Sequence, residues 1–116
     1  MRDYKKLNIW QKAYNLGLTI YIATKNFPKE EVYGLTSQLR RAGISVASNI
    51  AEGSRRSTEK DFRSFLHIAY RSTAELEVQL MYAKDLGYID NETCKSLIEE
   101  TLQISKMLNS LILKLS

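Results

Sequence analysis

The stretch Gln38-Leu-Arg-Arg-Ala-Gly-Ile-Ser-Val-Ala-Ser-Asn-Ile-Ala-Glu-Gly53 decides the fold of this chain. Its apolar residues recur at steps of three and four, the period of an α-helix. They are Leu39, Ala42, Val46, Ile50 and Gly53. A polar file runs beside them at the same spacing and consists of Gln38, Arg41, Ser45, Asn49 and Glu52. We therefore expect a helix that packs on two sides, one dry and the other hydrogen-bonded.

The same period continues outward from this stretch and predicts four helices separated by short breaks. The expected spans are Leu7 to Asn26, Pro28 to Ala51 or Glu52, Glu59 to Leu86, and a last helix that Asp90 or Asn91 caps. The expected apolar stripe of the first helix is Trp10, Ala13, Tyr14, Gly17, Leu18, Tyr21 and Ile22. That of the last helix is Leu97, Ile98, Leu102, Ile104, Leu108, Leu111, Ile112 and Leu115.

Residues with special backbone preferences lie at the expected breaks. Pro28 ends the first helix and opens the second, because proline disfavours a helical residue before it but suits a first turn. Gly53 and Gly87 are expected to close helices in the left-handed conformation. Ser57 or Thr58 is expected to cap the third helix.

Composition and helix lengths together predict one all-α domain over residues 1–116. The chain has one proline and five glycines, too few for a turn-rich β protein. Long helices joined by short loops pack as antiparallel neighbours, so we expect an up-down four-helix bundle. The basic residues that follow Met1 precede no apolar run, so we expect no secretory signal and no membrane span. The single Cys94 fits a cytoplasmic protein.

The charges of the chain gather at one end of the expected bundle. Residues 1–14, 48–66 and 104–116 would share that end, and they hold ten basic and four acidic residues, a net charge of +6. The remainder carries −2, which gives the total of +4. Such a basic surface attracts phosphate backbones, so RNA or DNA is an expected partner.

The residues expected to contact nucleic acid lie around the turn between the second and third helices, where side chains project freely. Arginine side chains there can bind phosphate oxygens two at a time. The alternative is that these charges only keep the helix ends soluble. The candidate contacts are Lys5, Lys6, Lys12, Arg55, Arg56, Lys60 and Arg63.

The polar file on the second helix is expected to meet a similar file on the third. A turn centred near Arg56 places Ser45 near Ile68 and Gln38 near Glu75, and it favours an Arg41–Glu75 pair. One interpretation is a hydrogen-bonded seam that fixes helix register, or a surface that another subunit completes. The other is a polar binding groove or catalytic cluster. The expected seam comprises Gln38, Arg41, Asn49, Glu52, Arg71 and Glu75.

Residue patterns typical of enzymes are absent from the sequence. His67 is the only histidine, and it has no cysteine partner at metal-ligand spacing. Glu75 and Glu77 are two residues apart on a helix and point to different sides. Cys94 near a helix start could have a lowered pKa, but a lone helical cysteine is more often a packing residue. We therefore expect no enzymatic activity, no cofactor, no metal and no small-molecule substrate.

Several motifs resemble the four-helix-bundle proteins encoded within intervening sequences of bacterial 23S ribosomal RNA genes. They are Trp10-Gln-Lys-Ala13, Phe27-Pro-Lys-Glu-Glu31, Tyr33-Gly-Leu-Thr-Ser-Gln-Leu-Arg-Arg-Ala42, Ser48-Asn-Ile-Ala-Glu-Gly53, Phe65-Leu-His-Ile-Ala69 and Ala74-Glu-Leu-Glu77. The resemblance implies a compact bundle that assembles as a homo-oligomeric ring, a pentamer in the family. It also implies binding to RNA or ribosomal material, and it brings no catalytic residues.

The alternative function is a structural or adaptor oligomer that binds another protein and has no role with nucleic acid. The sequence signal for this function is the number of tyrosines, which is more than a small bundle needs to bury. Exposed tyrosines are common at protein interfaces. The tyrosines that form this signal are Tyr4, Tyr21, Tyr33, Tyr70, Tyr82 and Tyr88.

Overall fold

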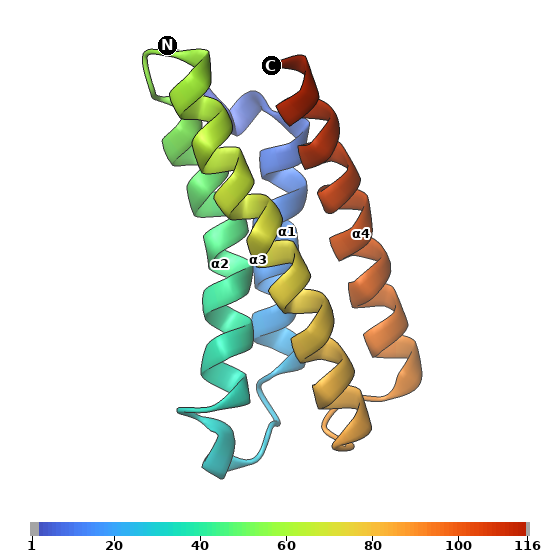
Figure 1. The fold of residues 1–116 in the computed structure, drawn as a ribbon. Helices are drawn as coiled ribbons and strands as arrows, with labels where there is room; N and C mark the ends of the chain where they lie inside the picture. The colour runs from blue at the N-terminus through green and yellow to red at the C-terminus, as the bar shows by residue number, and fades with distance from the viewer. Residues whose placement is uncertain (1–2, 116) are drawn as a thin grey trace.

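Four long helices run antiparallel to one another in the computed structural model, which describes residues 3–115 (Figure 1). They are α1 (Asn8–Ala23), α2 (Leu35–Ser54), α3 (Glu59–Asp85) and α4 (Asn91–Lys114). Short 3₁₀ helices precede α1 (η1, Tyr4–Lys6) and α2 (η2, Lys29–Glu31). The longest helix, α3, spans about 40 Å at 1.5 Å per residue. This length agrees with the longest dimension of the molecule, 43 Å.

Each helix packs against its neighbours in sequence, and α1 closes the arrangement against α4. The α2–α3 pair is the most extensive of these contacts, while α1 and α3 lie diagonally across the bundle. In Figure 1, α3 lies in front of the bundle and α1 lies behind it. The predicted up-down four-helix bundle is therefore confirmed.

The core consists mainly of aliphatic side chains from all four helices, including members of the stripes expected for α2 and α4. The most deeply buried side chains include Leu39, Val46, Ile50, Leu66, Leu76, Leu80, Leu97, Ile104 and Leu108. The expectation for Leu102 is wrong, because 40% of this side chain is exposed.

The expected apolar stripe of α1 is partly wrong. Ala13 and Gly17 of that stripe are buried as expected, and Ile9, Leu16 and Ile20 are buried beside them. Tyr14, Leu18 and Ile22 are instead 50%, 49% and 66% exposed. Apolar residues cover more than half of the circumference of α1, so periodicity alone does not select the buried side. Packing against α2 and α4 selects it, and a surplus apolar strip remains at the surface.

Side-chain caps and one glycine set the ends of the last two helices as expected. The Oγ1 atom of Thr58 accepts a hydrogen bond from the backbone N–H of Asp61 at 3.1 Å, which caps α3. Asp90 accepts one from the N–H of Thr93 at 2.7 Å and caps α4. Gly87 follows α3 with φ of 81°, the left-handed conformation that glycine adopts without strain.

The expected roles of Gly53 and Pro28 are wrong in instructive ways. Gly53 does not end α2, which continues through it to Ser54. Pro28 begins only the 3₁₀ helix η2, and α2 starts at Leu35 because the backbone of Gly34, at φ −113° and ψ −118°, interrupts the helix. The side chain of Glu31 then caps α2 by accepting a hydrogen bond from the Leu35 N–H at 2.9 Å.

Gly53 is required by the close approach of α2 and α3. A Cβ atom at this position would lie 2.7 Å from the Cβ of Phe65, 3.0 Å from the Cδ1 of Phe62 and 3.2 Å from the Phe62 carbonyl oxygen. Real Cβ contacts are longer than this, and two of the three neighbours are a backbone atom and a Cβ that cannot move independently of the helix. The missing side chain therefore lets both phenylalanines pack against α2.

Replacing this glycine tests that requirement. Gly53→Ala is expected to lower the free energy of unfolding by about 1–3 kcal/mol, because α2 and α3 must separate to accept the methyl group. Urea unfolding followed by circular dichroism measures the change. Gly17→Ala is the matched control, since its Cβ would meet α2 only at 3.7 Å. The control should be neutral or gain up to about 1 kcal/mol from helix propensity, and equal effects of both changes would contradict the account.

The cap on α2 makes stability depend on pH. Two hydrogen bonds hold the pKa of the Glu31 carboxyl below its ordinary value. The larger effect comes from the Leu35 N–H, and the smaller from the Tyr88 hydroxyl, which donates to Glu31 at 2.8 Å. A lowered folded-state pKa gives stability that is present above the unfolded pKa and lost as pH falls through the folded one.

Thermal melts should therefore show a loss of stability on acidification between about pH 5 and pH 3 that is smaller in Glu31→Gln than in the wild type. The amide keeps an acceptor for Leu35 but does not titrate. Glu30→Gln removes a charge from the same turn without removing the bond to α2, so it should retain the wild-type profile. Identical profiles for wild type and Glu31→Gln would show that the cap does not contribute.

Candidate functional site

A short network of polar side chains joins α2 to α3 at the middle of the bundle. The hydroxyl groups of Ser45 and Ser72 lie 2.9 Å apart and share a hydrogen bond. Asn49 donates from its Nδ2 to the Ser45 carbonyl oxygen at 2.8 Å and to the Ser45 hydroxyl at 3.0 Å. Further along, Gln79 donates to the Oε1 of Gln38 at 3.3 Å. The hydroxyl and amide groups of Ser45, Asn49 and Ser72 are satisfied and favour one packing over its alternatives. The Oε1 of Gln79, in contrast, is buried with no hydrogen-bond partner within residues 3–115.

The register of this seam differs from the expected one by one helical turn. Ser45 meets Ser72 rather than Ile68, and Gln38 meets Gln79 rather than Glu75. Each partner lies four residues further along α3 than expected. The reason is that α2 continues beyond Gly53, so the centre of the hairpin lies about two residues later than Arg56.

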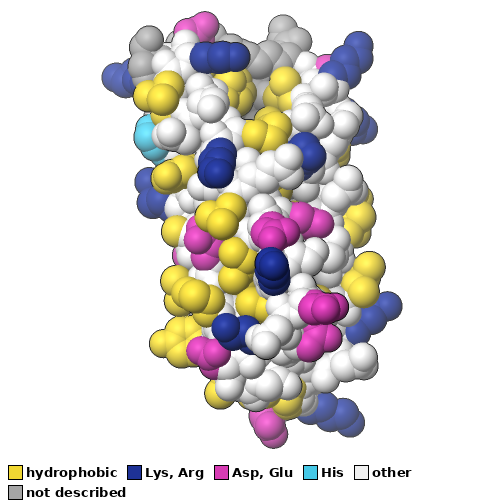
Figure 2. Space-filling model, turned by 90° about the vertical axis from the view of Figure 1, so that its right-hand side faces the viewer, with side chains coloured by type: hydrophobic (Ala, Val, Ile, Leu, Met, Phe, Trp, Pro, Cys, Tyr) yellow, Lys and Arg dark blue, Asp and Glu magenta, His cyan; other side chains and the backbone are white. Residues whose placement is uncertain are grey.

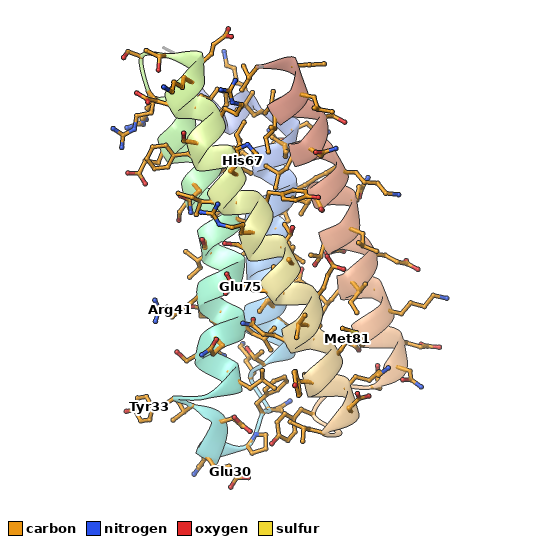
Figure 3. The ribbon with its side chains drawn as sticks, viewed as in Figure 1. Glu30, Tyr33, Arg41, His67, Glu75 and Met81 are labelled. Atoms are coloured by element: carbon orange, nitrogen blue, oxygen red, sulfur yellow. The ribbon has the colours of Figure 1, made fainter. Side chains whose placement is uncertain are left out.

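The expected Arg41–Glu75 pair does not form as a result. Within residues 3–115 the ion pairs are Arg56–Glu52 and Lys84–Asp85. Figure 3 shows Arg41 extending from α2 away from the bundle, while Glu75 lies on α3. Both side chains line the rim of a polar hollow of about 390 Å³ between the two helices. Arg71 is exposed on α3.

Of the six expected seam residues, the structure therefore brings Gln38 and Asn49 into contacts of the seam. Glu52 instead bonds to Arg56 at the end of α2. The seam residues that were missed are Ser72 and Gln79 on α3. Their signal is present in the sequence as polar residues on the α2 side of α3, but it is readable only once the register is known.

The residue types that commonly serve in catalysis or metal binding, among them Cys94 and His67, are not brought together at one place within residues 3–115. In residues 3–115, no three His, Cys, Asp or Glu side chains are placed to hold a metal ion. Cys94 is buried with its Sγ 3.5 Å from the carbonyl oxygen of Leu80, and burial raises the pKa of its thiol. The idea of an activated Cys94 is therefore wrong. His67 is exposed on α3 (Figure 3).

Four chain segments with basic residues converge at one end of the bundle. The start of α1, the end of α2, the start of α3 and the end of α4 lie together at the top of Figure 1. Two contacts join them: the guanidinium of Arg55 lies 5.3 Å from the ring centroid of Tyr4, and Arg63 donates to the Leu115 carbonyl oxygen at 2.9 Å. Figure 2 shows Lys and Arg side chains predominating at this end over one side of the molecule. We call this surface the basic end.

The arginines of the turn do not project freely, contrary to expectation. The guanidinium of Arg56 lies 4.6 Å from the ring centroid of Phe65 and 3.3 Å from Glu52. Arg55 is held over Tyr4 in the same way. A cation over an aromatic face gains electrostatic attraction while the N–H groups around its rim can still donate. These arginines are therefore oriented before any partner arrives.

The lysines of the basic end differ in position. Lys5, Lys6 and Lys60 are exposed near the turn. Lys12 lies apart, where it lines a hollow of about 220 Å³ between α1 and α4 together with Glu100. The candidate contacts that the fold places around the turn are therefore Lys5, Lys6, Arg55, Arg56, Lys60 and Arg63, and Lys12 faces a different side.

An apolar groove of about 450 Å³ runs between α1 and α2 on the outside of the bundle. Gly17 and Gly43 form its floor, since a Cβ on Gly43 would lie only 3.5 Å from the Gly17 Cα. A stack of three aromatic rings, Tyr4, Trp10 and Tyr14, lines its upper part with centroid separations of 5.0 and 5.1 Å. Leu18, Tyr21, Ile44, Ala47, Ser48 and Ala51 complete its walls.

The sequence indicated this groove only indirectly, through its surplus of tyrosines. Tyr33 is 95% exposed, Tyr82 is 62% exposed, and Tyr21 and Tyr70 are 40% and 39% exposed. Tyr88 instead bonds to Glu31. No helix of residues 3–115 is long and apolar enough to cross a membrane.

Comparison with known proteins gives a family and a solved fold. A family model described as "23S rRNA-intervening sequence protein" matches residues 5–110. A crystal structure of a protein of unknown function from the S23 ribosomal protein family of Bacteroides thetaiotaomicron is similar, with a TM-score of 0.81 and 26% sequence identity. The match covers 90% of this chain and 97% of that one. No curated protein matches this chain.

Proposed function

The chain belongs to the 23S rRNA-intervening sequence protein family, and on that premise we propose that it is a non-enzymatic, cytoplasmic, ring-forming protein whose basic end binds RNA. The observation that carries the proposal is the convergence of four basic segments at that end, with Arg55 and Arg56 held over aromatic rings. The exposed Lys5, Lys6 and Lys60 surround these two arginines.

The chemistry of the basic end suits phosphate groups better than bases. Guanidinium and ammonium groups contact backbone oxygens, which position a nucleic acid but do not read its sequence. An arginine already occupies one face of each of the two rings, Tyr4 and Phe65. Binding of this kind is electrostatic, tolerant of sequence and strongly dependent on salt.

A ring makes the modest charge of one chain effective. In cyclic symmetry every copy presents the same end to the same side of the ring. Several contacts of low affinity then act on one RNA strand at high effective concentration. A pentamer, which the resemblance implies, would combine five basic ends on one face.

RNA binding across a salt series tests this function. The affinity for a short fluorescent single-stranded RNA should fall linearly in log–log form, with a slope of about −0.7 for each phosphate neutralised. Arg55→Glu/Arg56→Glu should weaken binding by about tenfold or more, equivalent to about 1.4 kcal/mol, and should flatten the slope. Fluorescence anisotropy measures both.

A matched charge reversal at the other end controls for net charge. Lys29→Glu/Lys95→Glu changes the net charge by the same amount at two exposed sites in η2 and early α4. It should weaken binding far less than the arginine variant. Absence of binding at low salt, or equal losses in both variants, would refute the proposed function.

The ring itself has a separate test. Light scattering on the purified protein should give about five times the chain mass of 13.4 kDa, the count taken from the resemblance. Exclusively monomeric protein at micromolar concentration would contradict the ring and leave each basic end to act alone.

A second candidate function is an adaptor that binds another protein. The observation that favours it is Tyr33, which is 95% exposed beside the 52% exposed Val32, at the end of the bundle opposite the basic end. Exposed aromatic residues are frequent anchors of protein interfaces. Absence of RNA binding together with an intact ring would favour this second function.

A further inference from the structure

An exposed apolar stripe runs along the outer side of α3. Val78, Met81, Tyr82 and Leu86 are 48%, 45%, 62% and 55% exposed. Their spacing of three and four residues places them on one face of the helix. A surface helix normally presents polar residues to water on its outer face, so α3 has two apolar faces and the bundle covers only one. Figure 2 shows hydrophobic side chains gathered along the left edge of the lower half of the molecule.

We propose that the α3 stripe of one chain docks into the lower half of the α1–α2 groove of a second copy. The lower half of the groove comprises Leu18, Tyr21 and Ile44, and Arg40 lies beside it against the ring of Tyr21. This inference rests on the ring of the proposed function and supplies the interface for it.

Charge complementarity favours a second copy as the occupant. The helix α1 contains no acidic residue, and the only one of α2 is Glu52. The lower groove is bounded by Arg40, whose guanidinium lies 4.5 Å from the ring centroid of Tyr21. The α3 stripe has the exposed carboxylate of Glu75 at one end and that of Asp85 at the other, where Asp85 is paired with Lys84 at 3.7 Å. Figure 3 shows Glu75 and Met81 on α3. An apolar surface with the basic Arg40 at its edge thus meets an apolar stripe with the acidic Glu75 at its edge.

The two surfaces lie at the same level along the bundle. Gln38 on α2 bonds to Gln79 on α3, and Arg40, two residues further along α2, stacks on Tyr21 of α1. Val78 and Tyr21 are therefore at similar heights. Copies related by rotation about an axis parallel to the bundle can then join these surfaces without sliding past one another. A closed ring requires this absence of rise, and a steady rise would give an open filament.

The two surfaces also face away from each other, which excludes a simple two-fold dimer. The groove lies on α1 and α2, whereas the stripe lies on α3, diagonally opposite α1 (Figure 1). Each chain can therefore offer its stripe to one neighbour and its groove to another. Such head-to-tail contacts close into rings, and here they would place every basic end on the same face.

Complementary blocking variants test this interface. Leu18→Glu blocks the groove and Val78→Glu blocks the stripe, both at residues about half exposed. Each variant alone should lose the ring and have the mass of one chain by light scattering. Mixed in equal amounts they should form a dimer of two chains, because one intact groove and one intact stripe remain. Formation of that dimer also shows that both variants are folded.

Leu113→Glu is the matched control, a change from leucine to glutamate at a 65% exposed site on α4, and it should retain the ring. A ring that survives both Leu18→Glu and Val78→Glu would overturn the interface and leave the ring of the proposed function intact. A monomeric wild type would overturn both.

Cross-linking gives a second measurement that does not depend on charge. Chains with Leu18→Cys and chains with Val78→Cys should form a disulfide between the two variants on mild oxidation. The native Cys94 is buried, so it should not compete. Failure to cross-link while the ring persists, or equal cross-linking in a Leu113→Cys and Val78→Cys mixture, would refute the assigned contact.

Discussion

The close approach of α2 and α3 at Gly53 is the constraint on which the rest of the structure depends. A side chain there would collide with Phe65 and with the backbone of Phe62. Because the position is bare, α2 continues through it to Ser54, two or three residues past the expected end, and the hairpin acquires the register that the Ser45–Ser72 bond then fixes. The two interactions complement each other: the glycine sets how near the helices come, and the seam sets how they are aligned along their axes.

The surfaces of the molecule follow from that alignment. It brings the end of α2 and the start of α3 together beneath the Arg55–Arg56 turn, next to η1 and the end of α4. It also puts Gln38 opposite Gln79, so that the lower groove and the α3 stripe lie at one level. The basic end and the proposed ring interface are therefore consequences of one hairpin, although they lie on different parts of the bundle.

The sequence predicted those features that depend on local chemistry. Thr58, Asp90 and Gly87 act as expected, because caps and left-handed residues are decided within a few residues of chain. Gly53 is a glycine like Gly87 but has a different role. Its neighbours are side chains of α3, and the residues next to Gly53 in the sequence do not reveal that contact. The seam was expected between the correct helices but one turn away, because register depends on where the hairpin turns.

In the candidate site, too, some features could be predicted from the sequence and others depend on contacts between distant segments. The gathering of basic residues at one end followed from topology and could be predicted from sequence alone. That Arg55 and Arg56 lie over Tyr4 and Phe65, and that Lys12 faces α4, needed the structure, because these contacts join separate segments. The groove was missed because α1 is apolar over most of its circumference, and only packing reveals which strip remains outside.

The most direct test of the central claim is an amide NMR titration of the labelled protein with single-stranded RNA at low salt. The account predicts chemical-shift changes concentrated in residues 4–6 and 55–63, at the basic end, and their reversal on addition of salt. Changes concentrated instead around residues 29–33 and 86–92, at the opposite end of the bundle, would contradict it.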